Sequence, residues 1–124
     1  MILSRQAIER AIAEGKLKIE PLVHENFKEA SYSFTLAEEL TLKPGEFKVV
    51  LTKEIITLPM DLCYFVSTRA SIANLGIDAL QTSTFVEPGS NKQIKLEIKN
   101  NGSEPVTLKL GEPVVKAVFM QVLG

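Results

Sequence analysis

A glutamate in an alternating segment is the first residue whose surroundings could support chemistry. In residues 93–99, Q-I-K-L-E-I-K, every second side chain is apolar, and Glu97 stands between two lysines. Successive side chains of a strand point to opposite faces, so Glu97 is expected to face away from the apolar side chains. A carboxylate held on a rigid strand at a subunit interface can act as a general base. The alternative is a solvated strand face, where the lysines screen the glutamate; the lysines could also attract phosphate.

Arg69 is a candidate for binding phosphate. It is the only arginine after residue 10, and it is the second residue of the segment T-R-A-S-I-A-N-L at residues 68–75. We expect this segment to form a short helical insertion that Gly76 closes. A guanidinium beside backbone amides and hydroxyls, such as that of Ser71, can bind phosphate oxygens. The alternative is a structural arginine that pairs with a nearby acid.

Glu87 opens the turn V-E-P-G-S at residues 86–90. Its carboxylate could orient a sugar hydroxyl or a water, or it could simply be a polar residue at a turn. His24 and Cys63 have no partner motif, and the nucleophile, metalloprotease, P-loop and dinucleotide patterns are absent. We therefore assign no chemistry to His24 or Cys63.

The composition excludes several classes of protein. With 124 residues, 45% hydrophobic and 23% charged, the chain is expected to fold as one globular domain spanning residues 1–124. A net charge of −1 argues against a nucleic-acid partner. One cysteine and one histidine allow no internal disulfide and argue against a metal site. No apolar run suits a membrane span or a signal peptide, so we predict a cytoplasmic protein with no membrane partner.

The remaining pattern favours an all-β fold with a short N-terminal helix. Ser4 is a suitable N-cap for a helix at residues 5–14, and Gly15 suits the position after it. Segments rich in Val, Ile, Leu, Thr and Phe predict strands at Glu46–Leu51, Leu62–Val66, Ile77–Val86, Gln93–Lys99, Val106–Leu110 and Val114–Val122. Asn101-Gly102 is a hairpin signal. This spacing favours a sandwich or barrel over βαβ units.

A weak internal echo supports a jelly roll. Residues 40–50 and 106–116 both contain T-L-K-x-G-E, and two similar corners suit a double Greek-key layout, although turn chemistry alone could also select these residues. The last strand, at Val114–Val122, is apolar on both faces, which favours cover from a neighbouring subunit.

Several segments in order resemble the dCTP deaminase branch of the trimeric dUTPase superfamily. The similar segments are MILSRQAIERAIAEGKLKIEPL, SYSFTLAEEL, KPGEFKVVLTKEIITLP, STRASIANLGI, TFVEPGSNKQIKLEIKNNG and LKLGEPVVKAVF. The resemblance implies a distorted β jelly roll that forms a homotrimer, with nucleotide sites between subunits. It also implies dCTP or dUTP as the ligand and no metal held by the protein, with Mg²⁺ arriving on the triphosphate.

The resemblance assigns roles to five residues. Glu97 would activate the water that attacks C4 of cytosine, and Arg69 and Ser71 would contact phosphate. Asn74 stands where active deaminases have an arginine that supports the catalytic water. Glu87 matches the acid of the next motif, which is the catalytic aspartate in dUTPases.

The chain departs from the pattern in ways that leave the function open. Ala70 and Ser90 replace a serine and an aromatic residue, and we expect the jelly-roll core to be complete while a closing C-terminal segment and a central insertion are missing. The first hypothesis is a dCTP deaminase with activity impaired or lost. The alternatives are a catalytically inactive trimer with a nucleotide-binding, regulatory or structural role, a dUTP diphosphatase, and an unrelated jelly roll such as a capsid or decoration protein.

Overall fold

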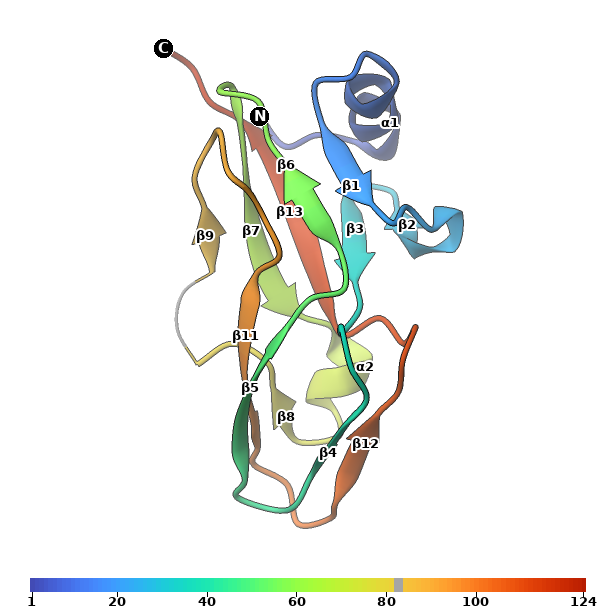
Figure 1. Ribbon diagram of the computed structural model, residues 1–124, viewed down its shortest axis with the longest axis vertical. Helices are drawn as coiled ribbons and strands as arrows, with labels where there is room; N and C mark the ends of the chain where they lie inside the picture. Colours follow the sequence, from blue (N-terminus) through green and yellow to red (C-terminus); the bar gives the residue numbers. More distant parts are fainter. Residues whose placement is uncertain (82–83) are drawn as a thin grey trace.

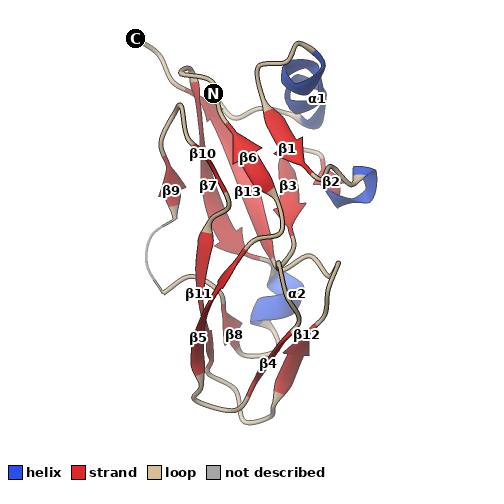
Figure 2. Ribbon diagram, in the orientation of Figure 1, coloured by secondary structure: helices blue, strands red, loops and turns tan. Residues whose placement is uncertain are grey.

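Antiparallel strands are the main secondary structure of the computed structural model, which describes residues 1–81 and 84–124 (Figures 1 and 2). Within these described ranges the strands make four sheets, accompanied by two helices and one 3₁₀ turn. This confirms the all-β expectation with a short N-terminal helix. Within the described ranges, no helix has the length and apolar character that crossing a bilayer requires.

The N-terminal helix, α1 (Arg5–Ala13), begins at the predicted residue and ends one residue before the predicted end, with Glu14 as its C-cap. The Ser4 hydroxyl accepts a hydrogen bond from the Ala7 amide at 3.2 Å. Gly15 follows the helix with φ of +74°, a conformation that side-chain-bearing residues adopt only with strain. Ile8 and Ala11 are buried, so the helix covers one end of the core.

One sheet has five strands in the order β2-β3-β13-β7-β9. Its strands are β2 (Phe27–Lys28), β3 (Ser31–Phe34), β7 (Leu62–Thr68), β9 (Phe85–Val86) and β13 (Val115–Gln121). An aromatic row runs through its buried side, with neighbouring ring centroids 4.9–5.9 Å apart; it comprises Phe27, Tyr32, Phe34, Tyr64 and Phe119. These tilted and edge-on contacts are favourable ring geometries and fix the sheet at the centre of the core.

The other three sheets are smaller. Their strands are β1 (Lys18–Glu20), β6 (Ile55–Thr57) and β10 (Asn91–Lys92) in one, β5 (Phe47–Leu51), β11 (Lys95–Asn100) and β8 (Ile77–Asp78) in the second, and β4 (Leu40–Leu42) with β12 (Val106–Leu108) in the third. The remaining short elements are η1 (His24–Asn26) and α2 (Ala70–Ala73). Buried side chains from all four sheets belong to a single hydrophobic cluster. The chain is therefore stabilised by one shared core.

The two T-L-K-x-G-E segments lie side by side in the fold. β4 pairs with β12 so that Thr41 faces Thr107, and their hydroxyls are 3.0 Å apart. The turns that follow use the same bond: Glu46 accepts from the Lys43 amide at 2.9 Å, and Glu112 accepts from the Lys109 amide at 3.0 Å. The echo thus corresponds to two similar corners.

Two predictions about the strands are wrong. Ile77–Val86 was expected as one strand, but β8 and β9 occupy its two ends and belong to different sheets; residues 82–83 lie outside the described chain.

The Asn101-Gly102 hairpin is also absent, because β11 and β12 pair with different partners. Instead, the Asn101 amide donates to Gly76 O at 2.8 Å. A Cβ added to Gly76 would lie 2.7 Å from the Gly102 Cα. Tight backbone contact explains these two glycines better than a hairpin does.

Candidate functional site

Glu97 lies in the middle of β11, on the outer face of its sheet. Its neighbours Leu96 and Ile98 are fully buried, whereas Glu97 is half-buried. Its cross-strand partner in β5 is Val49, which is 53% exposed. Directly paired residues project to the same face, so the carboxylate stands beside an exposed apolar side chain. The expected orientation of Glu97 is therefore what the structure has.

A surface hollow of about 610 Å³ opens beside Glu97. Apolar, basic and amide side chains share its wall with the carboxylate: Val49, Leu51, Thr84, Phe85, Val86, Lys92, Gln93, Ile94 and Lys95. An apolar wall with a few polar groups is the usual character of a small-molecule site. The lysines supply positive charge that complements an anionic ligand.

Arg69 stands at the end of β7, where the chain enters α2. Its carbonyl accepts from the amides of Ile72 and Ala73 at 3.0 and 2.9 Å, and its own amide donates to Val114 O at 3.0 Å. The side chain is half-buried and takes part in none of the ion pairs that residues 1–81 and 84–124 form. The backbone of Arg69 is thus fixed, and its guanidinium retains its capacity to bind an anion.

Ser71 and Asn74 are both exposed on α2, a four-residue helix in which only Ile72 is buried. Asn74 forms the C-cap, with its amide donating to Ala70 O at 2.9 Å. Its side chain is shorter than the arginine that the resemblance places there, so it reaches less far from the helix.

Glu87 directly follows β9 and is exposed. Its negative charge is close enough to contribute to the raised pKa of Cys63, although burial of the thiol is the larger cause. Raising that pKa keeps the thiol protonated and poorly reactive, which agrees with the assignment of no chemistry to Cys63.

The hollow contains one of the five predicted site residues. Glu97 lines it, whereas Arg69, Ser71, Asn74 and Glu87 do not. The residues that sequence reasoning missed are those that complete the hollow, above all Phe85, Lys92 and Gln93. The sequence signal that could have found them is the apolar outer face of β5. Its side chains Phe47, Val49 and Leu51 are 48%, 53% and 39% exposed.

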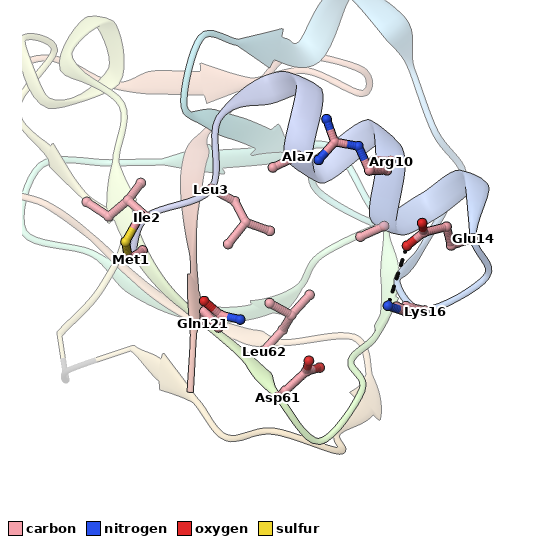
Figure 3. Close-up of a pocket in the computed structure, with 11 residues that line it drawn as sticks. Met1, Ile2, Leu3, Ala7, Arg10, Glu14, Lys16, Asp61, Leu62 and Gln121 are labelled. Atoms are coloured by element: carbon pink, nitrogen blue, oxygen red, sulfur yellow. Dashed lines mark ion pairs between the residues drawn. The ribbon is translucent and has the colours of Figure 1, made fainter. Parts of the chain in front are cut away.

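A second hollow, of about 370 Å³, lies between the N-terminal segment, α1 and the start of β7 (Figure 3). Leu3 and Leu62 line it, and Arg10 and Asp61 lie on opposite sides of it (Figure 3). None of the predicted site residues borders this hollow. Across the described ranges, no group of three or more His, Cys, Asp or Glu side chains is arranged to hold a metal ion.

The outer side of the five-stranded sheet also carries exposed apolar side chains. Phe65 pairs with Phe85 on one side and with Val118 on the other, and the two phenylalanine rings are 5.0 Å apart. Phe65 is 46% exposed, and Val118 is half-buried. An apolar row of this kind, beside the apolar face of β5, is typical of a surface that another molecule covers.

Residues 33–122 match the family described as dCTP deaminase-like. A dCTP deaminase of Idiomarina loihiensis is 34% identical over 77% of this chain and 53% of its own length. A "dCTP deaminase, dUMP-forming" of Methanobrevibacter smithii is 36% identical over 82% of this chain and 53% of its own. The chain spans about half the length of these relatives.

Solved structures share the fold. The 2'-deoxycytidine 5'-triphosphate deaminase of Agrobacterium tumefaciens has a TM-score of 0.81 at 20% identity, covering 98% of this chain and 48% of that one. The dUTPase of Staphylococcus bacteriophage 80alpha has a TM-score of 0.70 at 14% identity, covering 89% of this chain and 92% of the dUTPase. The jelly-roll expectation of the dUTPase-like type is therefore confirmed.

Proposed function

The chain belongs to the dCTP deaminase-like family, and we propose that it catalyses the hydrolytic deamination of dCTP to dUTP with Glu97 as the general base. The observation that carries this proposal is the position of Glu97. It is a half-buried carboxylate on a hydrogen-bonded strand, at the wall of a hollow that also contains lysines and an apolar surface.

In this reaction Glu97 accepts a proton from water while the water oxygen forms a bond to C4 of cytosine. The same proton is then delivered to the exocyclic amine, the C4–N bond breaks, and ammonia leaves. The products are dUTP and ammonia, and the carboxylate is regenerated. Rigid anchoring of the strand contributes to the rate because the base must lie within hydrogen-bond distance of the water.

Phosphate binding is the proposed task of Arg69 and Ser71, because a guanidinium and a hydroxyl both donate to phosphate oxygens. Asn74 would act in place of the expected arginine, and Glu87 would contact the sugar or a water. Mg²⁺ would enter with the triphosphate. Since none of these four residues lines the Glu97 hollow, we propose that a second copy of the chain supplies them.

The assembly we propose is a homotrimer with sites between subunits. The exposed apolar row of Phe65, Phe85 and Val118 and the exposed face of β5 supply the surface that such an interface requires. Sedimentation at micromolar concentration tests this, and a clean monomer mass would refute it. The substrate is a cytoplasmic metabolite, so we place the protein in the cytoplasm.

A second candidate is a family member that binds the nucleotide without turning it over. It is favoured by Asn74, whose short exposed side chain stands where the resemblance expects an arginine, and by Ala70 in place of a serine. Loss of an arginine that stabilises the transition state lowers the rate about tenfold for each 1.4 kcal/mol.

The test is release of ammonia from dCTP by purified protein with Mg²⁺, at high enzyme concentration and elevated temperature, with calorimetric titration of dCTP and dUTP in parallel. Turnover that Glu97→Gln removes supports the deaminase. Binding without turnover supports the second candidate, and neither binding nor turnover refutes both. Chromatography of the nucleotide product separates dUTP from dUMP, which tests diphosphatase chemistry.

A further inference from the structure

One buried carboxyl has no part in the proposed reaction. Glu54, between β5 and β6, is 1% exposed and is the only Asp or Glu among the buried side chains of the described residues. Burial raises its pKa, and hydrogen bonds from Thr35 oppose this effect. Burying a carboxyl costs free energy unless the group is hydrogen-bonded.

The carboxyl of Glu54 is bonded to the five-stranded sheet. Its Oε1 accepts from the Thr35 amide at 2.9 Å, and its Oε2 accepts from the Thr35 hydroxyl at 2.7 Å. Thr35 directly follows β3 and is 4% exposed. The Lys53 amide also donates to Thr35 O at 2.9 Å. The segment after β5 is thus fixed to the end of β3.

Thr52 connects the same segment to the strand of Glu97. It is completely buried, and its amide donates to Ile94 O at 2.9 Å. In a regular antiparallel pair, the return bond from Ile94 would reach the Thr52 carbonyl. Here the Ile94 amide donates to the Thr52 hydroxyl at 3.1 Å, and the carbonyl accepts from the Gln93 side chain at 2.9 Å.

The Thr52 hydroxyl therefore takes the place of a backbone acceptor at the start of β11. It donates its own proton to Glu54 O at 3.0 Å. Ile94 immediately precedes β11, and Glu97 lies on that strand. The register of the strand at this end depends on a side chain, which a substitution can remove.

The other end of the bond series reaches Arg69. The Arg69 amide donates to Val114 O at 3.0 Å, and the Val114 amide donates to Phe34 O at 2.9 Å. Phe34 is the residue before Thr35. Within one chain, a continuous set of hydrogen bonds thus runs from the backbone of Arg69, through β3, to the start of the strand that carries Glu97.

We infer that Thr52 and Glu54 are positioning residues for Glu97: they hold the start of β11 against the five-stranded sheet, whose strand β7 leads into Arg69. This inference rests on the proposed function. The two side chains touch no substrate in this role, and they act through Ile94 and Thr35.

The experiment compares Thr52→Val, which keeps the shape but removes the hydroxyl, with Thr52→Ser, which keeps the hydroxyl. For dCTP deamination, Thr52→Val should lower kcat by about tenfold or more while KM changes less than about twofold, and Thr52→Ser should recover most of kcat. Thr41→Val is the matched control, because Thr41 is an exposed threonine whose hydroxyl bonds to Thr107. It should leave kcat unchanged.

Equal loss of kcat in the valine and serine variants would overturn the inference, as would no loss in either. Thr35→Val is the second variant, for use if Thr52→Val fails to fold. It removes the hydroxyl bond to Glu54 and keeps the amide bond, so it should lower kcat by a smaller factor than Thr52→Val. An unchanged kcat in Thr35→Val would then count against the inference.

Amide hydrogen exchange separates this inference from the proposed function. Loss of the Thr52 hydroxyl should accelerate exchange at Ile94 relative to wild-type protein and to Thr41→Val. If wild-type protein shows no turnover, the proposed function fails while this measurement still decides whether Thr52 anchors β11. Unchanged exchange at Ile94 would show that it does not.

Discussion

Glu97 lies on a strand that is paired on both sides, whereas Arg69 lies at the start of a short, largely exposed helix. β11, which carries Glu97, is hydrogen-bonded to β5 on one side and β8 on the other, and its alternate side chains are fully buried. Arg69 leads into the four-residue α2, whose Ser71 and Asn74 are exposed. Two of the departures from the family pattern also lie here: Ala70 is in α2 and Asn74 is its C-cap. Substitutions on β11 are therefore expected to displace Glu97, whereas exposed side chains on α2 can be replaced without disturbing the core.

Glu97→Gln is the strongest test of the strand side of this comparison. The amide keeps the size of the side chain but accepts a proton poorly, so kcat for dCTP deamination should fall about 1,000-fold. The rate of ammonia release at saturating dCTP measures this. Glu39→Gln, at an exposed glutamate, is the control and should retain wild-type activity. Retained turnover in Glu97→Gln would show that β11 does not carry the base.

Arg69→Ala tests the helix side. Removing a charged donor to phosphate should weaken dCTP binding by about tenfold or more, from the 1.5–3 kcal/mol typical of a charge-assisted hydrogen bond. Calorimetric titration measures the Kd. Arg5→Ala removes an arginine from α1 and serves as the control. Equal affinity of wild type and Arg69→Ala would place the phosphates elsewhere.

Asn74→Arg tests whether the arginine that is missing next to α2 limits the rate. If the missing arginine limits the rate, kcat should rise by about tenfold, equivalent to 1.4 kcal/mol. Ala73→Arg adds the same charge to a neighbouring exposed position and should not change kcat. A rise in both variants would indicate a general charge effect, and a rise in neither would refute the idea that Asn74 limits the rate.

The smallest expected effect concerns the buried carboxyl behind β11. Because burial raises the pKa of Glu54, its protonated form is favoured in the folded state. The folded chain then binds this proton more tightly than the unfolded chain, so the contribution to stability is fully present below the unfolded pKa of 4.5. It is lost as the pH rises through the folded pKa.

Urea unfolding across this pH range measures the effect. The difference in unfolding free energy between wild type and Glu54→Gln isolates it from other carboxyls, including Glu46, whose pKa is lowered by the hydrogen bond from Lys43. The wild-type advantage should shrink with rising pH. A difference that stays constant with pH would contradict the assignment.

Local patterns predicted the elements that depend on neighbours in the sequence. Alternation gave the orientation of Glu97, and capping chemistry gave the start of α1 and its end to within one residue. The repeated T-L-K-x-G-E segments anticipated two corners, though not that they pair with one another.

Features that depend on long-range pairing could not be predicted in this way. Thr52 reads as an ordinary polar residue after a strand, and only its contact with Ile94 makes it part of the ladder. The wall of the hollow needs β5, β9 and β11 to come together. Asn101-Gly102 has the sequence of a hairpin, but contact with Gly76 determines its conformation.

The contact between Gly76 and Gly102 also constrains how the protein can evolve. A methyl group on Gly76 would meet backbone atoms of Gly102, and φ of +90° at Gly76 already disfavours any side chain. A methyl group on Gly102 would lie 3.0 Å from Leu75 O. A side chain at Gly76 therefore meets both a backbone clash and an unfavourable φ, whereas a side chain at Gly102 would require the Leu75 carbonyl to shift by a few tenths of an ångström. Mutational routes that reshape α2 must therefore leave Gly76, which follows this helix, unchanged.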